Sequence, residues 1–197
     1  MRGKFIKIGA VAVAMLIMAA ASGCGKQNSN NSTDNSSVQS TSTSGQAGDA
    51  KKNEKTVDVS IKTDKGEIVL ELRPDLMPIT VENFMKLVDK GFYNGLKFHR
   101  VEDWVIQGGD PEGTGRGGPG WSIKLETSPE LTHVKYAVGM ARSSAPDSAG
   151  SQFYILKKDS HGLDGQYAIF GTVIKGQDVV DKIAIGDKMT EVKRVNK

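Results

Sequence analysis

The chain has 197 residues, of which 38% are hydrophobic and 25% charged, and its formal net charge at pH 7 is +3. This length suits one folded domain with extensions. The single cysteine excludes an internal disulfide, so the stability of the folded part must come from packing. No nucleic-acid partner is expected.

Residues 1–23 have the pattern of a secretory signal peptide. Arg2, Lys4 and Lys7 precede an apolar run over residues 8–21, which ends in small residues. A basic start, an apolar middle and small residues at the cleavage point are typical of such signals. The apolar run is shorter than the roughly 20 residues that a membrane-spanning helix needs. We therefore expect the chain to be exported.

Cys24 follows Ala21-Ser22-Gly23 in a stretch that resembles a bacterial lipobox. In a lipobox the cysteine is lipid-modified and becomes the new N-terminus, although leucine is usual where this chain has Ala21. A plain secretory signal with an incidental cysteine is the alternative. A lone thiol in an exported protein otherwise has no disulfide partner, so we expect lipidation of Cys24. The protein would then be extracytoplasmic and anchored to the bacterial cell membrane by its acyl chains.

Residues 24–55 consist mainly of Ser, Asn, Thr, Gln and Gly, as in "NSNNSTDNSSVQSTSTSGQ". Such a segment cannot bury enough apolar surface to offset the entropy of ordering it. We interpret it as a disordered tether that holds a folded domain, residues 56–197, away from the membrane.

The folded domain opens with a predicted hairpin and a helix. The alternating stretches 57–63 and 68–73 flank the turn-forming "DKGE", a pattern typical of a β-hairpin. Hydrophobic residues then recur at helical spacing in "VENFMKLVDKG". Thr80 is the expected N-cap of this helix, and Gly91 is its expected end.

Short β-like runs separated by glycine-rich turns fill most of the remaining chain. They read "LKFHRV", "WVIQG", "YAVGMA", "SQFYIL" and "YAIFGTVI", and a second helix is expected over "QDVVDKIAI" before a weak final strand. Seven or eight short strands without βαβ alternation predict an antiparallel barrel or sandwich closed by two helices.

Several kinds of site lack their sequence pattern. The glycine-rich stretch 113–120 does not end in Lys-Ser/Thr as a phosphate loop does. His99, His133 and His161 are scattered without the spacing of metal ligands. The serines of residues 143–151 have no G-x-S-x-G elbow around them. We therefore predict no cofactor and no metal.

Alternate side chains of a strand share a face, which places Phe98 with Arg100 and Gln152 with Tyr154. If these faces meet, they form a shallow apolar pocket with one guanidinium and two amides at its rim. The expected walls are Trp104, Val105, Tyr154 and Leu163. Trp104, Val105 and Tyr154 could instead be plain core residues, and Arg100 could be a surface ion-pair partner. Gln107 and Gln152 could simply satisfy buried backbone groups.

Five motifs together resemble the cyclophilin-type peptidyl-prolyl cis/trans isomerases. They are "FHR", "QGGD", "GSQF", "LDGQYAIFG" and the earlier "PITVENF", in the family's order and nearly its spacing. The resemblance covers residues 56 to about 186. It implies a mainly β fold, a closed eight-stranded antiparallel cyclophilin-like barrel capped by two helices.

The resemblance also implies an activity. Rotation about an X–Pro bond crosses a barrier of about 18–20 kcal/mol, and lowering it by about 7 kcal/mol would accelerate the rotation ~10⁵-fold. The reaction needs no nucleophile or metal, only a site that binds the twisted amide best and donates a hydrogen bond to its nitrogen. A guanidinium suits this task, and the arginine of "FHR" is Arg100.

The resemblance further implies which residues bind the substrate. They are Phe98, His99, Trp104, Val105, Gln107, Ala141, Arg142, Gln152, Tyr154, Leu163 and Tyr167. Among these, Gln107 and Gln152 are expected to hold peptide carbonyls, and the backbone at Ala141 and Arg142 to pair with the substrate strand.

This chain departs from the family pattern near Arg100. The stretch between Arg100 and Gln107 is one residue shorter than usual. Trp104 and Tyr154 stand where phenylalanine is common, and Val105 stands where methionine is usual.

We therefore expect a monomeric, lipid-anchored isomerase that acts on proline-containing polypeptides, namely exported or surface proteins. A noncatalytic proline-peptide-binding module using the same groove is the alternative. A solute-binding lipoprotein would need a larger, two-lobed domain.

Overall fold

The structure, a computed structural model, describes residues 55–195. The predicted signal peptide, Cys24 and the predicted tether up to residue 54 lie outside the described residues. Within residues 55–195, neither helix is long and apolar enough to cross a membrane.

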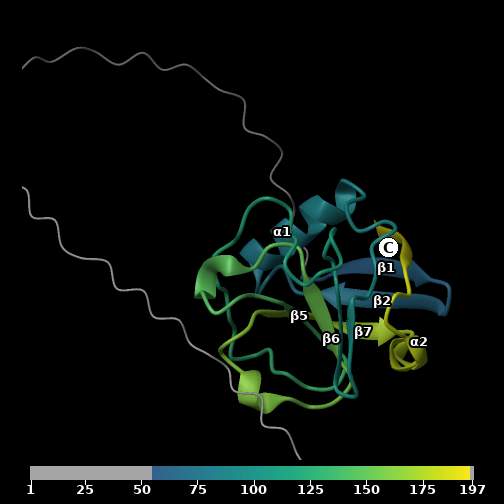
Figure 1. Ribbon diagram of the computed structural model, residues 1–197. Coiled ribbons are helices and arrows are strands. Elements are labelled where there is room, and N and C mark those ends of the chain that lie inside the picture. Colours follow the sequence, from purple (N-terminus) through teal and green to yellow (C-terminus); the bar gives the residue numbers. More distant parts are fainter. Residues whose placement is uncertain (1–54, 196–197) are drawn as a thin grey trace, which may run out of the picture. The chain divides into compact units, whose positions relative to one another are not determined.

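Eight antiparallel strands form one sheet in the order β3-β4-β6-β5-β7-β2-β1-β8 (Figure 1). The strands are β1 (Val57–Thr63), β2 (Gly66–Leu72), β3 (Arg100–Val101), β4 (Val105–Gly108), β5 (Ala137–Met140), β6 (Phe153–Leu156), β7 (Ile169–Lys175) and β8 (Met189–Arg194). The helices are α1 (Pro78–Asp89) and α2 (Gln177–Lys182), with 3-10 turns η1 (Pro146–Ser148) and η2 (His161–Leu163). The mainly β fold with two helices is confirmed.

The sheet is an open, curled half-barrel, so the expectation of a closed barrel is wrong. The end strands of the sheet order are β3 and β8, and they do not pair with each other in the described part of the chain. The segment that precedes β3 instead contacts the start of β8 and the segment before it, through the isolated bridge between Lys97 and Lys188 and backbone bonds such as Met189 N–H to Leu96 O at 2.8 Å. Since β3 has only two residues, it offers too short an edge for a continuous ladder.

The core lies inside the curl of the sheet. The predicted hairpin forms, with β1 and β2 in register from Val57–Leu72 to Thr63–Gly66. Phe84 of α1 is fully buried and packs against the rings of Tyr93, Phe153 and Phe170 at centroid distances of 5.0, 5.5 and 5.1 Å. Burial of large aromatic rings dominates core energetics, and this cluster fixes α1 against the strands that carry the site.

The start of α1 differs from the sequence expectation. The helix begins at Pro78, so Thr80 lies inside it and is buried, and Met77 at the N-cap makes no side-chain cap bond. The Glu126 carboxylate takes the capping role from a distant loop, accepting the N–H groups of Ile79 (3.3 Å) and Thr80 (2.9 Å). Proline at the first helical position has no N–H and so needs no acceptor. The other N–H groups of the first turn do need acceptors.

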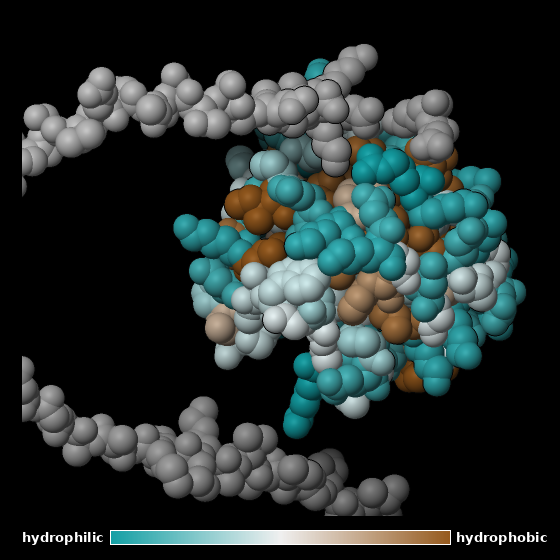
Figure 2. Space-filling view, turned by 90° about the horizontal axis from the view of Figure 1, so that it is seen from above, coloured by the Kyte–Doolittle hydropathy of each residue, from teal (hydrophilic) through white to brown (hydrophobic). Residues whose placement is uncertain are grey.

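Hydrophobic side chains on the face in Figure 2 form separate patches between hydrophilic ones. Exposed large hydrophobic residues in the described chain are few, and Ile185 at 70% is the most exposed of them. Single exposed apolar residues are normal on a protein surface. A functional surface must therefore be sought in a pocket rather than in a broad apolar face.

Candidate active site

A pocket of about 570 Å³ opens where β3, β4, β6 and β5 are neighbours in the sheet. It is lined by His99, Arg100, Trp104, Val105, Gln107, Thr114, Gly115, Ala141, Arg142, Tyr154, Leu163 and Tyr167. The structure thus brings together, from five separate chain segments, all but two of the residues predicted from the sequence. The two exceptions are Phe98 and Gln152.

Strand register explains why these residues meet. Arg100 pairs with Gln107, Gln107 with Tyr154, and Tyr154 with Gly139, in a row across four strands. Side chains directly opposite each other on neighbouring strands lie on the same face. Gly139 leaves room for the Tyr154 ring, because a Cβ there would lie 2.3 Å from the phenolic oxygen. At the end of this row, the Tyr154 ring therefore lies directly over the backbone of Gly139.

Arg100 is held from two sides while 42% of its side chain remains exposed. Its Nε donates to Glu102 Oε1 at 2.7 Å, and its Nη1 donates to Gln107 Oε1 at 3.2 Å. A guanidinium has five N–H donors in a rigid fork, so these two bonds orient it and leave donors for a ligand in the pocket.

The shortened segment after Arg100 forms a tight turn organised by Glu102. The Glu102 N–H donates to Val105 O at 2.8 Å, and the indole Nε1 of Trp104 donates to Glu102 Oε2 at 2.7 Å. The guanidinium carbon lies 5.3 Å from the Trp104 ring centroid, a cation–π distance. The hydrogen bond from Arg100 lowers the pKa of Glu102. One carboxylate thus positions both the arginine and the indole.

Glu102 was missed by the sequence reasoning. The signal that could have found it is its spacing, two residues from Arg100 and two from Trp104 on either side of a turn.

The amides of Gln107 and Gln152 bond to each other. Gln107 Nε2 donates to Gln152 Oε1 at 2.8 Å, and Gln152 Nε2 donates to the Gly117 carbonyl at 2.8 Å. Gln152 lines a second pocket of about 780 Å³ beyond this point, which Gln107, Ala141 and Arg142 also line. A continuous series of hydrogen bonds therefore connects Arg100 to the glycine-rich loop through Gln107 and Gln152.

Asp110, which the "QGGD" motif contains, holds this glycine-rich loop. It is buried and accepts the backbone N–H groups of Glu112 (2.8 Å) and Gly115. Burial acts to raise the pKa of Asp110, but backbone donors led by Glu112 and Gly115 outweigh it, and the pKa is lowered. The ionised carboxylate thereby fixes the loop that carries Thr114 and Gly115 into the pocket.

Phe98 does not share the pocket with Arg100, although strand alternation predicts that it should, whereas His99 lies at the pocket, as expected of a substrate-binding residue. Phe98 is fully buried in the core, 6.5 Å from the Phe153 ring, whereas His99 lines the pocket. Strand alternation does not apply to this pair, because β3 begins only at Arg100. Burial lowers the pKa of His99, which favours the neutral ring.

The opposite wall is made by Arg142 and Tyr167. The Arg142 guanidinium carbon lies 4.5 Å from the Tyr167 ring centroid, and its Nε donates to Gln166 O at 2.9 Å. The Ala141 N–H already donates to Gln152 O at 2.9 Å. Backbone and ring contacts therefore position both side chains of this wall.

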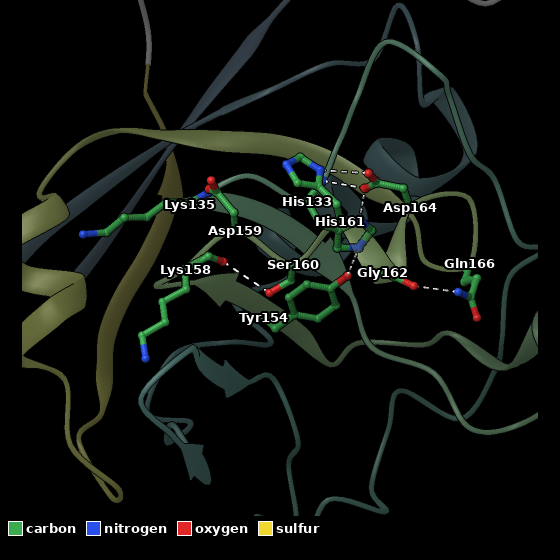
Figure 3. A network of polar contacts seen from close by, with 10 residues as sticks. All are labelled: His133, Lys135, Tyr154, Lys158, Asp159, Ser160, His161, Gly162, Asp164 and Gln166. Atoms are coloured by element: carbon green, nitrogen blue, oxygen red, sulfur yellow. Dashed lines mark hydrogen bonds and ion pairs between the residues drawn. The ribbon is translucent and has the colours of Figure 1, made fainter.

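Tyr154 closes the pocket from below and is tied to a polar network (Figure 3). Its hydroxyl lies 2.8 Å from His133 Nε2, and His133 Nδ1 lies 2.7 Å from Asp164 Oδ1. Leu163 lines the pocket directly before Asp164. Nothing in the sequence linked His133 to this site, because 21 residues separate it from Tyr154.

This arrangement suits binding and polarisation of an apolar group that carries an amide. The pocket joins aromatic and aliphatic walls to one partly exposed guanidinium. In residues 55–195, no three His, Cys, Asp or Glu side chains gather as they would around a metal ion.

Comparisons with known proteins agree with this geometry. The family model described as "Cyclophilin type peptidyl-prolyl cis-trans isomerase/CLD" matches residues 56–197. Peptidyl-prolyl cis-trans isomerase B of Bacillus subtilis is 45% identical over 132 residues, which are 66% of this chain and 92% of that protein. A peptidyl-prolyl cis-trans isomerase of Helicobacter pylori is 45% identical over 142 residues, 70% of this chain and 86% of that protein. The crystal structure of a Cryptosporidium parvum cyclophilin type isomerase in the presence of the dipeptide Ala-Pro has a TM-score of 0.66 and 30% identity, covering 71% of this chain and 99% of that one.

Proposed function

Because the chain belongs to the cyclophilin-type peptidyl-prolyl cis-trans isomerases, we propose that the pocket beside Arg100 is where this enzyme rotates X–Pro bonds. The observation that carries the proposal is the partly exposed guanidinium, oriented by Glu102 and Gln107 at the rim of an apolar pocket.

The proline ring would occupy the space between Trp104, Val105, Tyr154 and Leu163, with Tyr167 on the far wall. Rotation takes the amide through a twisted state in which its nitrogen becomes pyramidal and gains a lone pair. A guanidinium N–H donates to that lone pair in the twisted state and has no comparable acceptor in the planar one. Only such differential interactions accelerate the chemical step, and a preoriented donor costs no reorganisation when the charge develops.

The remaining roles concern the peptide. Gln107 and Gln152 would hold substrate carbonyls through the second N–H of each side-chain amide, because the first is used in the bonds to Gln152 and Gly117. The backbone at Ala141 and Arg142 would align the substrate as an extra strand. Phe98, which lies in the core, would support the base of β3 rather than touch the peptide.

The test is the isomerase activity of Arg100→Ala on a proline-containing peptide. We expect kcat/KM to fall by about 10²-fold, the cost typical of removing one transition-state donor. The free energy of unfolding should change by less than about 1 kcal/mol, because the ion pair with Glu102 is solvent-exposed. Retention of wild-type activity by the folded variant would place catalysis elsewhere.

We also propose that the enzyme works outside the cytoplasm as a lipid-anchored monomer, on exported or surface proteins whose folding waits for slow X–Pro isomerisation. The signal-like residues 1–23 and the lipobox-like position of Cys24 support this. Metabolic labelling with a radioactive fatty acid should mark the wild type and not Cys24→Ser. Equal labelling of both would remove the anchor from the proposal.

A further inference from the structure

His133 reaches the floor of the pocket from outside the sheet. It precedes β5, is 1% exposed, and stands behind Tyr154, which is 5% exposed. The two rings are nearly parallel, with centroids 6.2 Å apart, and His133 Nε2 meets the Tyr154 hydroxyl. Figure 3 shows this chain of contacts continuing to Asp164 and His161.

The partners of Asp164 determine which nitrogen of His133 carries the proton. An ionised carboxylate only accepts hydrogen bonds, and Asp164 Oδ1 accepts both the backbone N–H of His133 at 2.7 Å and the Nδ1 side at 2.7 Å. Donors led by the His133 backbone lower the pKa of Asp164 to about 2. The carboxylate is therefore ionised at neutral pH, and His133 Nδ1 must donate to it.

The direction of the next hydrogen bond follows. Burial lowers the pKa of His133 despite the nearby Asp164, so the ring is neutral at pH 7 and its Nε2 has no proton. Burial also raises the pKa of Tyr154, so its hydroxyl keeps its proton. Tyr154 must then donate to His133 Nε2. The Tyr154 hydroxyl therefore donates to His133, and His133 donates to Asp164.

The hydrogen bond from Tyr154 to His133 restrains the Tyr154 ring, which Gly139 on the neighbouring strand cannot do. Tyr154 lies over Gly139, which has no side chain to hold the ring in place. Tyr167 touches the Tyr154 ring edge-on, with centroids 6.3 Å apart. The Tyr154 ring also packs in a small apolar cluster with Val105, Leu156 and Ile169, and the hydroxyl bond adds a directional restraint to that packing.

We propose that His133 is a positioning residue of the isomerase: held in one tautomer by Asp164, it accepts the Tyr154 hydroxyl and thereby fixes the ring that forms the floor of the proline pocket. The inference rests on the proposed function, since it assumes that this pocket receives the proline.

A purely structural role would give a different pattern of effects. His133 also ties down Asp164 and hence the turn that carries Leu163. If that were its whole effect, replacing His133 would cost the same activity whether or not residue 154 had a hydroxyl.

A double-mutant cycle separates the two roles. In the wild-type background, His133→Leu leaves the buried hydroxyl unpaired, and we expect kcat/KM to fall about tenfold. In the Tyr154→Phe background the same change should cost less than about twofold. His133→Gln, whose amide oxygen can accept the hydroxyl, should recover part of the loss only when Tyr154 is present. Equal losses in both backgrounds would overturn the inference.

His161→Leu is the matched control, because His161 also contacts Asp164, at 3.0 Å, but is exposed and lies in no bond with Tyr154. We expect its kcat/KM to stay within about twofold of the wild type. A loss equal to that of His133→Leu would assign the effect to Asp164 and its turn.

Ring ¹⁵N NMR of the wild-type protein at pH 7 tests the tautomer without any variant. We expect His133 to carry its proton on Nδ1 and to have an unprotonated Nε2. A proton on Nε2 would overturn the inference. Failure of the proposed function would look different, because Arg100→Ala would then keep its activity whatever the His133 result.

Discussion

At the scale of single residues, the site depends on hydrogen-bond partners that belong to none of the sequence motifs. Arg100 and Gln107 were predictable because their motifs stand in a recognisable order, but Glu102 and His133 act through contacts that only the folded chain creates. Glu102 is 44% exposed, and exposed ion pairs contribute little to stability. Its contribution is therefore geometric, since one carboxylate orients both Arg100 and Trp104.

Glu102→Ala should lower kcat/KM about tenfold, because the guanidinium and the indole both lose their orienting acceptor. The melting temperature should move by less than about 2 °C. Asp103→Ala is the control, since Asp103 is the next residue, is 77% exposed and, within residues 55–195, forms its ion pair with Lys158. Similar activity of the two variants would refute a positioning role for Glu102.

At the scale of elements, sequence patterns located the hairpin, both helices and the strands, because hydrophobic periodicity is a local property. The start of α1 was not predictable in this way. Its cap comes from Glu126, 46 positions from Thr80 along the chain. Capping rules consider only residues close to the helix start in sequence, so they cannot predict it.

Glu126→Ala should lower the free energy of unfolding by about 1 kcal/mol, the usual cost of losing an N-terminal cap. Urea denaturation followed by far-UV circular dichroism measures it. Glu130→Ala, an exposed glutamate in the same loop, should change the value by less than about 0.5 kcal/mol. If the two variants are equally stable, Glu126 does not cap α1.

At the scale of the whole folded domain, the strands were predictable but the closure of the sheet was not. Closure depends on whether the two end strands meet, and β3 is too short to form that edge. The pocket lies at this end of the sheet, beside β3 and β4, where the open edge leaves the guanidinium accessible.

Stability of the domain should fall as the pH drops below about 6.5. Burial lowers the folded-state pKa of both His133 and His99, whereas the unfolded chain binds these protons near pH 6.5. Their contribution is therefore complete above that pH and is lost as the pH falls towards the lowered values. Thermal unfolding between pH 7.5 and 5 should show this decline, and His133→Leu should make it shallower. A melting temperature independent of pH in this range would contradict the neutral state of these rings in the folded domain.

The central claim is that Arg100 accelerates rotation of a proline bound in the pocket, and exchange NMR of an Ala-Pro peptide tests it most directly. It reports binding and cis–trans exchange in the same sample. We predict that the wild type binds the peptide and speeds exchange, and that Arg100→Ala still binds it but speeds exchange at least about 10²-fold less. Undiminished exchange with Arg100→Ala, or peptide binding by the wild type without faster exchange, would contradict the account.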